Sequence, residues 1–292
     1  LLIPLKFMDK KAILYVGGGA MAGVFGAGVV TRLQEGNVYS KLSHVYGASA
    51  GAFDIAYFLA KQTKKGSTIY WEDLVHDFID VSNFPKILAK IVLGKKDFKN
   101  VVDIDYLIKV SKTAKDLDLG EIKRSVIEAK VKVYDLEEKK LKYLDLKKNP
   151  FQRLKESSSV APYFYSEGQR NIDGDILNSL DYDYLRKKHP DQKLIFVLNH
   201  RVNRSFFSRA RKFLEGKLVA RLFESPDLKQ RFRDEGKNMN EDVKKISSDE
   251  NALLITPSRI NPSNNSTTDS EKLIQTHKLG FIEAQKILDF LE

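Results

Sequence analysis

Residues 12–31 read "AILYVGGGAMAGVFGAGVVT", a stretch of twenty residues without a charge, six of which are glycine. Its first part, "AILYV", is apolar and rich in β-branched and aromatic residues, as is typical of a buried strand. After the glycines at 17–19, apolar residues recur at near-helical spacing until Gly36, a suitable residue to end a helix. The stretch therefore predicts a strand, a tight glycine turn and a helix.

The length and the basic flanks of this stretch also suit a transmembrane helix. Three consecutive glycines argue against one, since each costs a helix about 1 kcal/mol relative to alanine. We therefore interpret residues 12–31 as part of a globular fold rather than as a membrane span.

The glycine turn could serve either of two kinds of site. "GGGAMA" (17–22) satisfies the dinucleotide-binding pattern G-x-G-x-x-G/A, but that motif needs an acidic residue at the end of the next strand. The next strand lies within "SHVYGASAG" (43–51), and no acid ends it. A nicotinamide or flavin enzyme is thus disfavoured, and we expect the exposed amides of the turn to face an anion or an oxyanion.

A G-x-S-x-G pentapeptide follows one strand later. "GASAG" (47–51) places Ser49 between a short β run and the predicted helix "AGAFDIAYFLAK" (50–61). In a nucleophile elbow, glycines such as Gly47 and Gly51 permit a strained turn that exposes the serine at a helix N-terminus. A nucleophile and its oxyanion donors would then lie on neighbouring strand ends, as acyl transfer requires.

A serine nucleophile also needs a base. His200 ends the strand-like "KLIFVLNH" (193–200) and His277 lies on the last predicted helix, so either could complete a triad, although surface and capping roles are commoner for such histidines. The better candidate is Asp173, which with Gly174 follows a short β run in "RNIDGDI" (170–176). An Asp-Gly pair alone indicates only a turn.

Three blocks in the same order resemble the patatin-like phospholipases: "GGAMAGVFGAGVV" (18–30), "GASAG" (47–51) and "SSSVAPYFYSEGQRNIDGDI" (157–176). The resemblance implies a three-layer α/β fold with a central, mainly parallel sheet flanked by helices. It also implies a Ser49–Asp173 dyad without histidine, and neither a metal nor another cofactor.

The resemblance assigns the oxyanion hole to the backbone amides of Gly18, Gly19, Ala20 and Met21. The chain departs from the family here: Ala20 replaces a third glycine, Ala22 replaces an arginine, and Asp175 replaces the small residue after Asp-Gly. Ala20 can supply an amide provided that its φ stays negative, because a positive value would cost about 1–2 kcal/mol. We expect modest hydrolysis, raised by restoring Ala20→Gly and Ala22→Arg together.

The remaining pattern predicts one α/β domain over residues 1–292. Residues 11–62 hold the oxyanion loop and the nucleophile elbow, and 68–125 read as a helical cap. "KVKVYD" (130–135) and "KLKYLDL" (140–146) form a hairpin. Residues 193–292 supply two further strands, helices at about 205–248 and 270–291, and a polar loop at 261–270.

Composition limits the partners. The 292 residues are 42% hydrophobic and 30% charged, as in a globular protein, and no cysteine is present for a disulfide or a thiolate. The net charge of +10 favours an anionic partner. "NRSFFSRARKFL" (203–214) and "KILAKIVLGKK" (86–96) are amphipathic and basic, which suits peripheral contact with an anionic membrane or simply a core-packed helix with a solvated face. No nucleic-acid module is recognisable.

The start of the chain, "LLIPLKF" (1–7), lacks the features of a signal peptide, so we expect a cytoplasmic protein. The expected function is hydrolysis of lipid esters, with phospholipase A, lysophospholipase and general esterase activities all open. The alternative is a weakly active or inactive lipid- or partner-binding relative.

Overall fold

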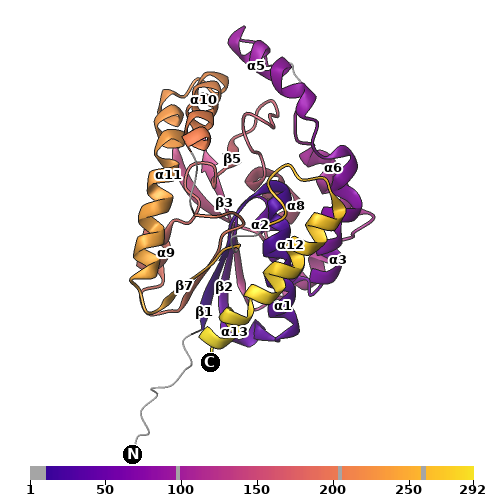
Figure 1. The fold of residues 1–292 in the computed structure, drawn as a ribbon, viewed down its shortest axis with the longest axis vertical. Helices are drawn as coiled ribbons and strands as arrows, with labels where there is room; N and C mark the ends of the chain where they lie inside the picture. The colour runs from indigo at the N-terminus through magenta and orange to yellow at the C-terminus, as the bar shows by residue number, and fades with distance from the viewer. Residues whose placement is uncertain (1–10, 97–98, 203–205, 258–260) are drawn as a thin grey trace, which may run out of the picture.

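The structure, a computed structural model, describes residues 11–96, 99–202, 206–257 and 261–292, with the backbone alone at 206–212. Its centre is a seven-stranded sheet of order β4-β3-β2-β1-β6-β7, with β5 paired to β3 (Figure 1). The strands are β1 (Ala12–Val16), β2 (Leu42–Gly47), β3 (Glu128–Asp135), β4 (Lys140–Asp145), β5 (Asn171–Asp173), β6 (Leu194–Val197) and β7 (Ala252–Ile255). All neighbours pair in parallel except β4 and β5, which are antiparallel to β3.

Helices connect and cover these strands. The α-helices are α1 (Val24–Glu35), α2 (Ala50–Leu59), α3 (Thr63–Thr68), α4 (Leu74–Asp77), α5 (Phe84–Val92), α6 (Ile104–Lys112), α7 (Leu119–Arg124), α8 (Pro150–Ser157), α9 (Tyr182–Lys188), α10 (Phe206–Leu222), α11 (Pro226–Ser247), α12 (Ser270–Glu283) and α13 (Gln285–Phe290). The short turns are the 3-10 helices η1 (Ala20–Gly23), η2 (Val38–Lys41) and η4 (Val81–Asn83) and the π-helical η3 (Ile69–Asp73). The region predicted as helical from about 205 to 248 is two helices, because Pro226 begins a new one.

The sheet lies between two layers of helices, and β1 shows why. Its side chains alternate between the faces, as they must in a strand. Leu14 and Val16 pack into the core shared with α1, α2 and α12, whereas Ile13 and Tyr15 pack into the core shared with α9 and α11. Figure 1 shows α9 and α11 on one side of the sheet and α1, α2 and α12 on the other. The predicted α/β fold, with a mostly parallel sheet flanked by helices, is confirmed.

The pairing of β3 brings distant parts of the chain together. β2 follows one edge of β3 as far as the pair Gly47–Val131, and β5 then pairs with β3 at Val133–Asp173. β4 occupies the opposite edge over the whole of this length, so β2 and β5 share the same edge of β3. Ser49, which follows β2 by two positions, is therefore close to the end of β5, with Lys132 of β3 between the two pairings.

Candidate active site

Ser49 occupies a sharp turn between β2 and α2. Its φ of 52° and ψ of −123° are strained for a residue with a side chain. Close packing enforces the turn, since a Cβ on Gly51 would lie 2.1 Å from the carbonyl oxygen of Val16. Ser49 is 8% exposed and lies at the N-terminus of α2, where the helix dipole favours negative charge. These features are those of a nucleophile elbow.

The serine triplet after α8 supports this turn and its surroundings. Ser157 Oγ accepts the backbone N–H of Ser49 at 3.1 Å and donates to the carbonyl of Lys132 at 2.8 Å. The carbonyl of Ser159 accepts the backbone N–H of Asp173 at 3.0 Å. One short segment thus anchors the backbone of both residues of the predicted dyad. The sequence signal was the triplet itself, three consecutive serines at the end of α8.

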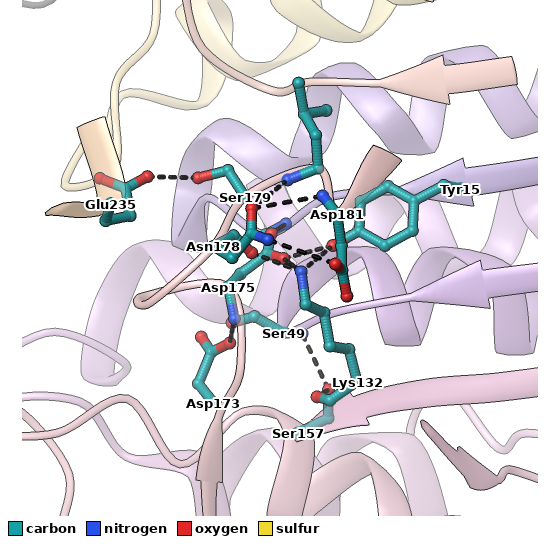
Figure 2. A network of polar contacts seen from close by, with 12 residues as sticks. Tyr15, Ser49, Lys132, Ser157, Asp173, Asp175, Asn178, Ser179, Asp181 and Glu235 are labelled. Carbon is teal, nitrogen blue, oxygen red and sulfur yellow. Dashed lines mark hydrogen bonds and ion pairs between the residues drawn. The ribbon is translucent and has the colours of Figure 1, made fainter. Parts of the chain in front are cut away.

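Asp173 ends β5 and is 3% exposed. Its carboxylate is near enough to the Ser49 side chain for the serine to lower its pKa, and its Oδ1 accepts the backbone N–H of Asp175 at 2.8 Å. Burial, and then the neighbouring charge of Asp175, raise the pKa of Asp173 to about 7. Ser49 and Lys132 also act on this carboxylate, and both lower its pKa. No histidine is among the groups with the largest effects on that pKa. Figure 2 shows these side chains around the end of β5.

The glycine loop passes directly beside the serine. A Cβ on Gly18 would lie 2.9 Å from Cβ of Ser49, so no larger residue fits there without displacing the elbow. Two of the four amides predicted for the oxyanion hole already have acceptors. The Gly18 N–H donates to Asp175 Oδ2 at 2.6 Å and the Met21 N–H donates to the Asn265 carbonyl at 3.4 Å. Within the described ranges, the two amides between them have no acceptor.

Ala20 provides one of these two amides, and its backbone differs from the expectation. Its φ is +46°, in the left-handed region, whereas the sequence interpretation required a negative value. The preceding Gly19 also has a positive φ, of 154°. An alanine at this φ costs about 1–2 kcal/mol. Surrounding contacts must therefore hold the loop in place.

Asn199, which follows β6, is one such contact. Its Nδ2 donates to the carbonyls of Gly17 at 2.6 Å and Gly18 at 3.3 Å, and its Oδ1 accepts the N–H of Gly26 at 2.8 Å. The sequence analysis missed this residue, although a polar side chain after a buried strand was a usable signal. Ala22, for which the sequence resemblance implied an arginine, is buried and 1% exposed. Asn199, which follows β6, therefore holds the loop.

Asp175 is the second contact. Its carboxylate accepts hydrogen bonds from the Tyr15 hydroxyl and the Gly18 amide, and lies 3.4 Å from the Nζ of Lys132. Lys132 and Tyr15 are both fully buried. Lys132 also donates to the carbonyl of Asn178 (Figure 2). The residue that departs from the family pattern therefore belongs to a buried polar network, which the sequence analysis did not anticipate.

A mostly apolar cavity extends from Ser49. The walls come from α1, α2, α3, η3 and α6, so much of the segment predicted as a cap lines it. Apolar side chains dominate, among them Val30, Phe53, Ile69 and Leu107. Asp54 also lines it, but burial raises the pKa of this carboxyl well above its ordinary value. An uncharged, mostly apolar cavity suits a hydrocarbon chain.

His277 is part of the packing between helices. Its Nε2 lies 3.1 Å from Ser67 Oγ and 3.4 Å from Thr31 Oγ1, and its ring meets Trp71 edge to face. Burial lowers its pKa to about 4. These partners belong to α1, α3 and η3 rather than to the Ser49 turn, so His277 is a neutral interior residue.

One further prediction can be compared with the structure only in part. The amphipathic segment 203–214 lies mostly outside the described residues and side chains. Among the helices that the structure describes, none is long and apolar enough to cross a membrane. No group of three or more His, Asp or Glu side chains in the described parts of the chain could hold a metal ion.

Comparisons with known proteins agree with this architecture. No curated protein matches the sequence significantly. VipD from Legionella pneumophila matches in structure with a TM-score of 0.51 and 15% identity, over 96% of this chain and 67% of that one. The type III effector ExoU matches with a TM-score of 0.32 and 15% identity, over 81% of this chain and 53% of that one. The ExoU–SpcU complex from Pseudomonas aeruginosa gives 0.31 and 13%, over 96% of this chain and 59% of that one.

The VipD match shows the fold, and the weaker ones add nothing to it. This chain spans about two thirds of VipD and little more than half of the ExoU chains. The family assignment comes from the sequence, since the model of the patatin-like phospholipases matches residues 14–276. That range includes the glycine loop, the Ser49 elbow and the Asp173 turn. The chain therefore belongs to the patatin-like phospholipase family.

Proposed function

We propose that this protein is a serine acyl hydrolase of lipid esters in which Ser49 is the nucleophile and Asp173 the general base. The observation that carries the proposal is the strained elbow at Ser49 beside the end of β5, where the buried carboxylate of Asp173 has a pKa raised to about 7 by burial and by Asp175. A carboxylate of ordinary pKa is a weak base at neutral pH, whereas a base whose pKa lies near the working pH is close to optimal. Membership of the family supports lipid acyl hydrolysis in general.

The first half of the reaction forms an acyl-enzyme. Ser49 Oγ attacks the ester carbonyl carbon while its proton passes to Asp173. The negative charge that develops on the carbonyl oxygen faces the N-terminus of α2 and the two unpaired amides of Gly19 and Ala20, which serve as the oxyanion hole. The intermediate then collapses, and the alcohol leaves with the proton that Asp173 held.

The second half releases the acid. A water molecule attacks the acyl carbonyl as Asp173 accepts one of its protons, and Ser49 Oγ leaves and regains a proton from Asp173. The apolar cavity beside Ser49 binds the acyl chain, so long-chain esters are better substrates than short ones. Phospholipase A and lysophospholipase activities both meet this requirement, because each cleaves a fatty acyl ester.

We further propose that α5 brings the enzyme to anionic membrane surfaces. Val92 and Leu93, at the C-terminal end of α5, are 51% and 69% exposed, and exposed lysines 86, 95 and 96 accompany them. Exposed apolar side chains surrounded by basic residues are typical of helices that bind at membrane interfaces. Figure 1 shows α5 at the far end of the molecule, beside the tip of α10 and away from the chain termini.

A catalytically weak lipid-binding protein is the second candidate, and the positive φ of Ala20 is the observation that favours it. An oxyanion donor that is misplaced costs about a hundredfold or more in turnover. The cavity beside Ser49 would then bind a lipid without cleaving it.

Hydrolysis of p-nitrophenyl esters of increasing chain length separates these proposals. The enzyme proposal predicts turnover that rises with chain length and falls to background in Ser49→Ala. Ser111→Ala removes another buried hydroxyl, on α6, and is the matched control, with turnover like that of the wild type. Equal rates in Ser49→Ala and the wild type would contradict the proposal that Ser49 is the nucleophile of an ester hydrolase. Fluorescent fatty-acid binding by an inactive wild type would then favour the lipid-binding protein.

A further inference from the structure

Asp175 connects the two halves of the site. Its Oδ2 accepts the Gly18 amide hydrogen at 2.6 Å, while its own backbone N–H donates to Asp173 Oδ1 at 2.8 Å. The first bond reaches the glycine loop and the second reaches the carboxylate that contacts Ser49. A single residue thus fixes the distance between the oxyanion loop and the Asp173 turn.

The charge of Asp175 is compensated where it lies. The Nζ of Lys132 is 3.4 Å from its Oδ1, and the Tyr15 hydroxyl donates to the same oxygen. Lys132 is fully buried and also donates to the Asn178 carbonyl, so its ammonium group is held from two sides. Hydrogen bonds from an amide to an ionised carboxylate are stronger than those between neutral groups. Burial raises the pKa of Asp175, whereas Lys132, the Gly18 amide and the Tyr15 hydroxyl lower it. With Asp175 ionised, the bond to Gly18 is a firm attachment.

The attachment lies where a small displacement has consequences. Gly18 is against the Cβ of Ser49, and the next two residues supply the unpaired amides. Ala20 holds an unfavourable φ of +46°. Relaxation of the loop away from this conformation would therefore lower its free energy. Asn199 restrains the carbonyl side of the loop, but the only amide of Gly17–Met21 that a charged group holds is that of Gly18.

We propose that Asp175 is a positioning residue that clamps the oxyanion loop to the Asp173 turn, in place of the arginine and third glycine that this chain lacks. The proposal rests on the proposed esterase function. It assigns Asp175 no contact with the substrate. Its effects are exerted through Gly18 on one side and through Asp173 on the other.

The clamp also implies a characteristic pH response. The charged and titratable groups around it are Tyr15 of β1, Lys132 of β3, Tyr143 of β4, Asp173, and Asp181 before α9. The negative charge of Asp175 raises the pKa of Asp173, and Lys132 lowers it. Removing only the charge at 175 should therefore move the acidic limb of the rate profile to lower pH, whereas a purely structural side chain would leave the limb in place.

The test compares three variants of the whole chain on a soluble p-nitrophenyl ester between pH 5 and 9. Asp175→Asn keeps an acceptor for Gly18, so kcat at pH 8.5 should stay within about threefold of the wild type while the midpoint of the acidic limb falls by about half a pH unit or more. Asp175→Ala removes the acceptor, and kcat should fall about 10- to 100-fold with KM nearly unchanged. The double variant Asp175→Ala, Lys132→Met also removes the buried ammonium group that Asp175→Ala alone would leave unpaired. It therefore keeps the test available if the single variant unfolds.

Asp242→Ala is the matched control, because it removes another buried carboxylate, on α11, that accepts the Tyr182 N–H. It should change neither kcat nor the acidic limb. Wild-type kcat in folded Asp175→Ala, or an unmoved limb in Asp175→Asn, would overturn the clamp. NMR hydrogen exchange of the Gly18 amide gives a readout without activity: the amide should be protected in the wild type and exposed in Asp175→Ala. If the wild type hydrolyses no ester, the function fails, and the same exchange measurement still decides the clamp.

Discussion

Ser49 and Asp173 meet because β2 and β5 use the same edge of β3 in succession. β2 leaves that edge after Gly47, two residues before the serine, and β5 takes it up at Asp173. The serine hydroxyl therefore faces a carboxylate that the chain supplies more than a hundred residues later. This arrangement buries the carboxylate, which raises its pKa to about 7.

The first prediction is a single ionisation in the pH dependence of hydrolysis. Asp173 must be ionised to accept a proton, so kcat/KM should rise with pH through a midpoint near 7 and level off above it. His277→Ala should leave the midpoint unchanged, since this histidine packs against Thr31 and Ser67. A midpoint that moves in the histidine variant would show that an imidazole takes part.

The second prediction concerns stability. The pKa of Asp173 in the folded state, about 7, exceeds the ordinary value of about 3.9, so the folded protein binds the proton more tightly. Its contribution to stability is therefore lost as pH rises from 4 to 7. Asp173→Asn should raise the free energy of unfolding at pH 8 by about 1–3 kcal/mol and by less at pH 5.

Urea unfolding at the two pH values measures this difference. Glu250→Gln, at an exposed position, serves as the control and should have equal and small effects at both. An Asp173→Asn variant that is less stable than the wild type at pH 8 would contradict the raised pKa.

The third prediction concerns the strained loop. Ala20→Gly should raise the free energy of unfolding by about 0.5–1 kcal/mol, the relief of the left-handed φ less the greater freedom of glycine in the unfolded chain. The rate should stay within about threefold, because the backbone already has the required form. Ala22→Arg should instead destabilise the fold by about 1–3 kcal/mol, since Ala22 is buried.

This outcome differs from the sequence expectation that restoring both residues would raise activity. Thermal unfolding of the two single variants measures the stability changes, and ester turnover of the double variant shows whether activity rises. A stabilising Ala22→Arg, or a destabilising Ala20→Gly, would contradict the loop described here.

The fourth prediction concerns the membrane surface. Leu93→Ser with Lys86→Glu and Lys95→Glu should weaken binding to anionic vesicles about tenfold or more and spare hydrolysis of a soluble ester. Sedimentation with vesicles of phosphatidylserine and phosphatidylcholine, at low and high salt, measures it. Lys123→Glu with Lys278→Glu reverses two exposed charges on α7 and α12 and is the control. Equal loss of vesicle binding in both variants would show that net charge alone, and not α5, accounts for the binding.

Much of the fold could be predicted because its signals are local. The apolar strand at 12–16, the glycine turn and the G-x-S-x-G elbow each depend on residues a few positions apart, and the hairpin depends on a short turn. The order of blocks then placed Ser49 and Asp173 at one site as a hypothesis.

The rest could not be predicted because it depends on contacts across the chain. Whether Ala20 has a positive φ is decided by what holds the loop, and that is Asn199 after β6 and Asp175 after β5. Lys132 has the sequence context of an ordinary strand lysine, and only the sheet shows that it is buried beside Asp175. From the sequence, Asp175 was only a departure from the family pattern.

The most direct test of the Ser49–Asp173 dyad is the turnover of Asp173→Asn at pH 8.5 on a long-chain p-nitrophenyl ester, with Asp242→Asn as the buried-carboxylate control and the fold verified by circular dichroism. If the dyad performs the reaction, kcat falls at least about a thousandfold in Asp173→Asn, Ser49→Ala in the same protein adds little further loss, and Asp242→Asn behaves as the wild type. Turnover within about tenfold of the wild type in a folded Asp173→Asn variant would contradict it.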